Sequence, residues 1–146
     1  MEWNEIKNRG DIDYLLWQYG GFNDACLKEL TFTSGAYVDE NETLYYGSRE
    51  DREIRAIFNR QWNPPAVELL FTGVKKCSIP GWQDTYSCDI YGIYLEFRDD
   101  LIPGKNLIVW ADNCNFDLQE EAGRGILEEP MPTYIIATGL RWRFLQ

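Results

Sequence analysis

Apolar and polar positions alternate with a spacing of two along most of the chain, and helical spacing is confined to residues 11–19. Asp11 is placed to cap this short helix, and Gly20-Gly21 is placed to end it. The apolar positions at helical spacing are Ile12, Leu15, Leu16 and Tyr19. Since a helix of roughly two turns is unstable alone, we expect this stripe to pack against the edge or end of a sheet.

Segments with a spacing of two predict about seven β-strands after residue 20. They span residues 26–33, 54–62, 67–72, 75–79, 86–98, 107–111 and 134–144. Gly73 separates the third segment from the fourth, and we expect these two to form an adjacent strand pair. The longest segment, 86–98, ends at Asp99-Asp100 and has on one face Tyr91, Ile93, Leu95 and Phe97. The last segment has on one face Tyr134, Ile136, Leu140 and Trp142.

Strands joined by turns, without helices long enough for parallel crossovers, predict a mainly β domain. We expect an antiparallel β-sandwich or a strongly curled sheet of about seven strands, with one short N-terminal helix. The chain has 146 residues and no convincing linker, so residues 1–146 are expected to form a single domain. Six Trp, nine Tyr and seven Phe support the β assignment, because aromatic side chains favour half-buried strand surfaces.

The chain is acidic, with 14 basic and 24 acidic residues and a net charge of −10. Such a field repels nucleic acid and membrane phosphates and attracts basic protein surfaces. Two segments without periodicity carry most of it: residues 39–52 sum to −3 (two basic, five acidic) and residues 112–132 to −5 (one basic, six acidic). The second segment is the candidate binding loop, and its acidic residues are Asp112, Asp117, Glu120, Glu121, Glu128 and Glu129.

The chain contains no histidine, which excludes Ser-His-Asp and Cys-His nucleophilic machinery and His-rich zinc sites. The strand carboxylates that could act in pairs are Glu29, Glu68, Glu96 and Asp112. Alternating strand carboxylates are more typical of a solvated sheet face. The acidic stretches 39–42 and 112–117 do not fit the spacing of a calcium-binding loop. We therefore expect no catalytic residue, no metal site and no cofactor.

The four cysteines match no metal or redox spacing, so we expect free thiols, with a disulfide pair as the alternative. No apolar segment is long enough to span a bilayer, and no secretion signal is present, so we expect a soluble cytoplasmic protein. The stretch Arg141-Trp142-Arg143 mixes charge with an aromatic ring. On a strand, Trp142 would face the core and the arginines would pair with Glu68 or Glu96.

Several short motifs resemble a family of bacterial proteins, found mainly in Firmicutes, to which no activity is attached. They are Trp17-x-x-Gly20-Gly21-Phe22-Asn23-Asp24-Ala25-Cys26, Ser34-Gly35-Ala36-Tyr37-Val38, Val67-Glu68-Leu69-x-Phe71-x-Gly73-Val74, Trp110-Ala111-Asp112 and Leu140-Arg141-Trp142-Arg143. The turn into the first strand and the Phe71-x-Gly73-Val74 strand end also loosely resemble small β-rich immunity proteins of bacterial toxin systems. Asn23 stands where that pattern has histidine, and we interpret Asn23 and Asp24 as structural turn residues.

These observations favour a non-enzymatic, acidic, protein-binding domain, with an immunity-type inhibitor of a basic toxin as the specific hypothesis. The alternative is a carbohydrate or small-molecule binding protein, or a carboxylate-dependent hydrolase, with Trp62, Trp82 and Trp110 exposed for stacking. A third interpretation is a structural subunit that pairs through a sheet edge. The expected partner is a basic protein, neither nucleic acid nor membrane, and the oligomeric state is open.

Overall fold

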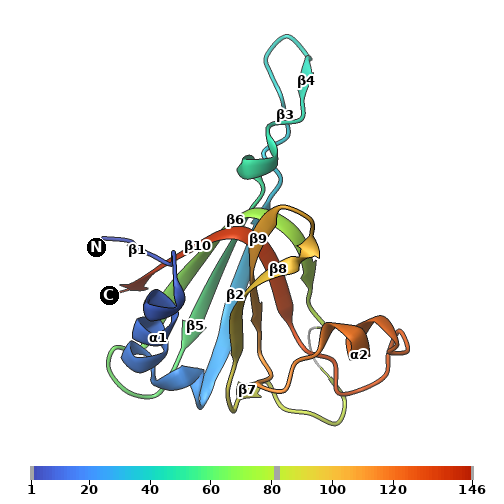
Figure 1. The fold of residues 1–146 in the computed structure, drawn as a ribbon. Helices are drawn as coiled ribbons and strands as arrows, with labels where there is room; N and C mark the ends of the chain where they lie inside the picture. Colours follow the sequence, from blue (N-terminus) through green and yellow to red (C-terminus); the bar gives the residue numbers. More distant parts are fainter. Residues whose placement is uncertain (1, 81–82, 146) are drawn as a thin grey trace.

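The computed structural model describes residues 2–80 and 83–145, and their main feature is one antiparallel sheet of eight strands that curls into a half-barrel (Figure 1). Seven strands follow the order β7-β2-β5-β6-β10-β9-β8, and β1 pairs with β10 outside this path. The strands are β1 (Asn4–Glu5), β2 (Ala25–Thr33), β5 (Glu53–Asn59), β6 (Ala66–Ser78), β7 (Asp89–Ile90), β8 (Tyr94–Ile102), β9 (Lys105–Ala111) and β10 (Tyr134–Leu145). The mainly β fold is confirmed, as a curled sheet and not a sandwich.

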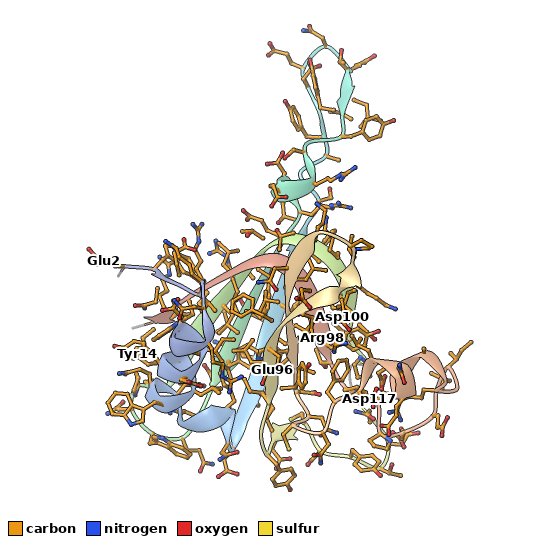
Figure 2. The ribbon with its side chains drawn as sticks, in the orientation of Figure 1. Glu2, Tyr14, Glu96, Arg98, Asp100 and Asp117 are labelled. Atoms are coloured by element: carbon orange, nitrogen blue, oxygen red, sulfur yellow. The ribbon has the colours of Figure 1, made fainter. Side chains whose placement is uncertain are left out.

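The short helix α1 (Arg9–Gln18) packs against the inner side of the curled sheet. It begins two residues earlier than predicted, because Asn8 is its cap and the Asp11 side chain accepts hydrogen bonds from the backbone N–H groups of Asn8 and Lys7. Its buried side chains belong to the main core. Arg9 also reaches across to Glu96 of β8 at 2.6 Å, which joins α1 to the far edge strand (Figure 2 labels Glu96).

Aromatic rings fill the centre of the main core. Phe22, in the 3₁₀ turn η1 (Gly20–Phe22), meets Phe58 edge-on with ring centroids 5.2 Å apart. Trp110 of β9 lies 5.2 Å from the Phe58 ring and is completely buried. Each of these three rings is in contact with the other two and has little room to rotate. Their packing therefore fixes the positions of β5 and β9 relative to η1.

Strand β6 runs without interruption through Gly73, so the predicted pair of strands on either side of that glycine is wrong. Gly73 adopts a φ of +62°, a conformation that glycine tolerates and other residues rarely adopt. A Cβ at this position would overlap the hydroxyl oxygen of Thr138 on β10. The glycine therefore marks a sharp bend inside one long strand, and not a turn between two.

The predicted long strand 86–98 is also wrong, since the chain divides there into β7 and β8 at opposite edges of the sheet. Tyr91 lies between them and is 79% exposed, whereas Leu95 is buried in the main core. At its other end β8 continues past Asp99-Asp100 to Ile102, because the turn is made by Pro103-Gly104. Acidic residues on an edge strand are solvated and do not need to end it.

The face predicted for the last strand holds only for its second half. Leu140 and Trp142 lie in the main core, but Tyr134 and Ile136 point to the outer face. The side chains change face near Thr138-Gly139, directly opposite the bend at Gly73. The outer residues belong to a second apolar cluster, whose buried members are Leu107, Val109, Ala111, Phe116, Tyr134 and Ile136.

The pairing predicted for the C-terminal arginines is confirmed for Arg143. Its guanidinium lies 2.8 Å from the carboxylate of Glu68, which is almost fully buried on β6. Arg55 of β5 approaches the second oxygen of the same carboxylate at 3.3 Å. Trp142 faces the core as expected. The buried acid is thus held between two arginines on neighbouring strands.

Candidate functional site

The two acidic segments found in the sequence lie at opposite ends of the sheet (Figure 1). Residues 34–50 leave the sheet between β2 and β5 and extend far beyond it, carrying β3 (Tyr37–Val38) and β4 (Leu44–Tyr45). Residues 112–133, which include the short helix α2 (Leu118–Ala122), lie at the other end beside β8, β9 and β10. The two segments therefore cannot form one continuous binding surface.

Residues 112–133 cover the second apolar cluster. Phe116 lies 5.7 Å from the Tyr94 ring and 5.0 Å from the Tyr134 ring, and Leu118 packs against the same group. The segment is therefore folded down on the outer face of the sheet. Burial of these apolar side chains explains the length of the segment without a binding role.

Three of the predicted binding residues have structural roles in the folding of this segment. Asp117 caps α2 by accepting a hydrogen bond from the Gln119 N–H at 2.8 Å (Figure 2). Glu121 pairs with Arg124 at 2.8 Å, and both side chains are mostly buried. Glu128 accepts a hydrogen bond from the backbone N–H of Gly125 at 2.9 Å.

Two more of these residues link the segment to other parts of the chain. Glu129 accepts hydrogen bonds from the hydroxyl of Thr85 and from the Asp84 N–H, and these bonds lower the pKa of its carboxyl group. Asp112 accepts a hydrogen bond from the Thr133 N–H at 3.0 Å, while burial raises its pKa to about 6. Glu120 is exposed, as are Asp117 and Glu128. Binding of a partner by these six residues stays a prediction.

The segment at the other end forms a projecting ribbon, which we call the arm (residues 35–47). Tyr37 and Tyr45 are directly paired across its two strands, and their rings stack with centroids 5.0 Å apart. Val38 and Leu44 form the next pair, so their side chains lie on the opposite face of the ribbon. All four are exposed, as is Tyr46 at 76%. The arm therefore presents apolar side chains on both faces.

The base of the arm is fixed to the sheet. Gly35 and Gly47 both have positive φ, and a Cβ on Gly47 would come within 2.8 Å of the Gly35 oxygen. The 3₁₀ turn η2 (Arg49–Asp51) follows, and Glu50 accepts a hydrogen bond from the Thr138 hydroxyl of β10 at 2.9 Å. These contacts hold the direction in which the arm leaves the sheet.

The tip of the arm is acidic. Asp39, Glu40 and Glu42 lie between its strands, and residues 35–47 contain no lysine or arginine. The backbone N–H groups of Thr43 and Asn41 donate to Asp39 and lower the pKa of its carboxyl group. The Asp39 carboxylate at the tip therefore stays negatively charged well below neutral pH.

The strand carboxylates Glu29, Glu68 and Glu96 are not brought together by the sheet. Glu68 and Glu96 are each bound to arginine, on strands that are not neighbours in the sheet, and Glu29 is exposed on β2. Within the described part of the chain, no three His, Cys, Asp or Glu side chains converge as metal ligands. All four cysteines are unpaired.

The predicted stacking platform of exposed indoles is not formed as expected. Trp110 is completely buried among the core aromatics, so no sugar can stack on it. Trp62 is 45% exposed and lies beside the Arg60 guanidinium at 5.4 Å. Trp82 lies outside the described residues.

Comparison with protein-family models, with curated proteins and with solved structures finds no match for this chain. The resemblance to bacterial proteins of the Firmicutes, and more loosely to immunity proteins, stays a prediction. In residues 2–80 and 83–145, no helix is long and apolar enough to cross a membrane.

The sequence predicts an acidic segment without periodicity where the structure has the arm. Its signal was nevertheless present, because the apolar pairs Tyr37-Val38 and Leu44-Tyr45 flank a polar turn at equal distance. Gly35 and Gly47 then bracket the whole unit. The pattern is that of a hairpin, but two-residue strands fall below the length at which alternation can be recognised.

Proposed function

We propose that this chain is a non-enzymatic protein-binding domain that inserts its arm into a basic cleft of a partner protein, in the manner of an immunity-type inhibitor of a basic toxin. The observation that carries the proposal is the arm itself: a fixed ribbon with exposed apolar side chains on both faces and an acidic tip. A ribbon that is apolar on both faces suits a cleft, which covers both, better than a flat surface, which covers one.

Charge supports a basic partner. The arm carries −3 and the whole chain −10, so a positively charged cleft would attract the tip and guide the encounter. A cleft that receives phosphate in its own reaction has this charge, and an inserted acidic ribbon would occupy it. We place this interaction in the cytoplasm, where the reducing conditions suit four unpaired thiols.

The test is an affinity capture from a lysate of the source organism, with bound proteins quantified by mass spectrometry at low and high salt. The bait variant Glu40→Gln/Glu42→Gln removes two charges from the tip and leaves the Asp39 turn intact. Its control, Glu2→Gln/Glu5→Gln, removes two exposed charges at the N-terminal strand β1, away from the arm (Figure 1). A second pair compares Tyr46→Ser with Tyr91→Ser, which are 76% and 79% exposed.

We expect one basic protein to be retained by the parent and by both controls, to be lost with both arm variants, and to elute as salt rises. Its activity, measured with the purified protein, should fall when this chain is added in equal amount. Capture that is the same for arm variants and controls would overturn the role of the arm. A captured protein whose activity is unchanged would overturn inhibition alone.

A further inference from the structure

A pocket of about 310 Å³ is lined by residues of β7 and by residues at the adjoining ends of β2, β9 and β10. These elements meet at the end of the sheet opposite to the arm (Figure 1). One part of its wall is apolar and is formed by Leu27, Ile79, Pro80 and Ile90. The polar part includes Asp89, Asp112 and Thr133. An apolar hollow with a few convergent polar groups is the usual form of a small-molecule site.

Trp110 lines this pocket and carries an unused hydrogen-bond donor. Its side chain is completely buried, and its indole N–H has no hydrogen-bond partner among the described residues. The ring is held by Phe22 and Phe58, at 6.3 and 5.2 Å between centroids, so it is not free to turn toward another acceptor. A buried donor without a partner is destabilising and is uncommon in folded proteins. An acceptor atom of a ligand would remove this cost.

Asp112 lies two residues after Trp110, at the end of the same strand, and also lines the pocket. The alternation of a strand places side chains two residues apart on the same side. The Thr133 N–H orients the Asp112 carboxylate by donating to Oδ1 at 3.0 Å. A carboxylate can accept more than one hydrogen bond, so Asp112 remains able to receive a donor from a ligand.

The charge of the pocket selects the ligand class. Asp89 and Asp112 are both in its wall, and the lining residues include neither lysine nor arginine. Asp89 is the first residue of β7, and its carboxylate is oriented by a hydrogen bond from the Ser87 hydroxyl. Two carboxylates beside apolar side chains disfavour an anion and favour a cation with an apolar body.

We propose that this pocket binds a small primary amine with an apolar body and one acceptor atom: the ammonium group pairs with Asp112, and the acceptor receives the Trp110 indole N–H. This site is independent of the arm and lies at the other end of the molecule. The proposal is limited to ligands that fit a pocket of this size. Nucleotides are disfavoured by charge, because their phosphates would lie beside two carboxylates.

Three probes separate the two contacts. Tyramine carries both the ammonium group and a hydroxyl acceptor, phenethylamine lacks the acceptor, and p-cresol lacks the amine. Each is titrated into the ¹⁵N-labelled protein, and the Trp110 indole N–H resonance is followed by NMR. We expect a saturable shift with tyramine, weaker binding with phenethylamine, and none with p-cresol. Absence of a saturable shift with both amines would overturn the proposal.

Two variants test the ammonium contact. Asp112→Asn keeps an oxygen to accept from Thr133 but removes the charge, and Glu120→Gln removes an exposed charge nearby as the control. We expect tyramine affinity to fall by about ten-fold or more with Asp112→Asn, as for loss of a charge-assisted hydrogen bond, and to stay within about two-fold with Glu120→Gln. Equal affinities would contradict the proposal. If Asp112→Asn does not fold, the comparison of tyramine with p-cresol on the parent protein decides the question.

Discussion

Gly47 and Gly35 lie against each other at the base of the arm, where a Cβ on Gly47 would come within 2.8 Å of the Gly35 carbonyl oxygen. Gly47 also has a φ of +71°, a conformation unfavourable for other residues. The direction of the arm thus depends on two positions that have no side chain.

The variant Gly47→Ala should loosen the arm and leave the sheet folded. We expect a local cost of about 1–3 kcal/mol from strain and overlap together. Chymotrypsin should cut at Tyr45 and Tyr46 faster than in the parent, while the urea midpoint of the sheet changes little. The control is Gly104→Ala, whose φ of +77° gives similar strain but whose Cβ would meet no atom within 4 Å. If chymotrypsin also cuts the arm faster in Gly104→Ala, the cause is a general loss of stability from backbone strain and not the contact between Gly47 and Gly35.

Loss of Glu68 should destabilise the sheet, because this buried carboxylate lies between Arg143 and Arg55. We expect Glu68→Ala to lower the free energy of unfolding by about 2–4 kcal/mol, somewhat less than for a fully buried pair, since both arginines are partly exposed. Urea denaturation measures the change. Glu29→Ala, at an exposed position on β2, should cost less than about 0.5 kcal/mol. Similar losses for the two variants would contradict a structural role for the Glu68 pairing.

The covering role of residues 112–133 can be tested at Phe116. Replacement by alanine removes its contacts with Tyr94 and Tyr134, and we expect a cost of about 2–4 kcal/mol. Amide hydrogen exchange should accelerate in residues 112–133 and in β9, whose outer-face side chains this segment covers. Ile126→Ala, which is 94% exposed, should leave both measurements unchanged. If Phe116→Ala behaves like Ile126→Ala, the segment does not depend on this ring.

Asp112 should make stability fall as pH rises. Burial raises its pKa from 3.8 to about 6, with a smaller contribution from repulsion by Glu121, and Asp89 and Arg124 also line the hollows beside it. A folded-state pKa above the unfolded value means that the folded protein holds the proton more tightly. This favours folding below about pH 4, and the advantage is lost as pH rises through 6.

The measurement is the free energy of unfolding of Asp112→Asn minus that of the parent, from pH 4 to 7. We expect this difference to increase with pH by up to about 3 kcal/mol. Asp100→Asn should show no such rise between pH 4 and 7, because the hydrogen bond from Arg98 lowers the Asp100 pKa and its benefit is lost only below about pH 4 (Figure 2). A flat difference for Asp112→Asn would show that this carboxyl group titrates normally.

The spacing of apolar residues predicted the elements whose structure is determined within one short segment of the chain. The stripe that includes Ile12 and Leu15, and the alternation of Ile54, Ala56 and Phe58, correctly gave the helix and β5. Glycine misled the prediction at Gly73, because a positive φ ends a strand in one context and bends it in another. The resulting change of face in β10 depends on Gly73 and Thr138 together, and no single segment contains both.

For the candidate sites too, the sequence revealed local features but not the contacts between residues far apart in the chain. The acidic residues were visible as charge, but the roles of Asp117 and Glu129 depend on partners at α2 and Thr85. The pocket was half visible, since Trp110-Ala111-Asp112 places two polar groups on one side of a strand. Its apolar wall comes from Leu27 of β2, from Ile79 and Pro80, and from Ile90, which the pairing of β2 with β7 brings to it.

Strand β10 lies in the middle of the sheet, between β6 and β9, although it comes last in the described sequence. During synthesis, β5 and β6 can pair early, but β8 and β9 join the rest of the sheet only through β10. Until the ribosome has released residues 134–145, the nascent chain exposes two unjoined halves with open strand edges, which are prone to associate with other chains. The arm is made long before this point, so it acquires its fixed base, through Thr138, only when β10 has arrived.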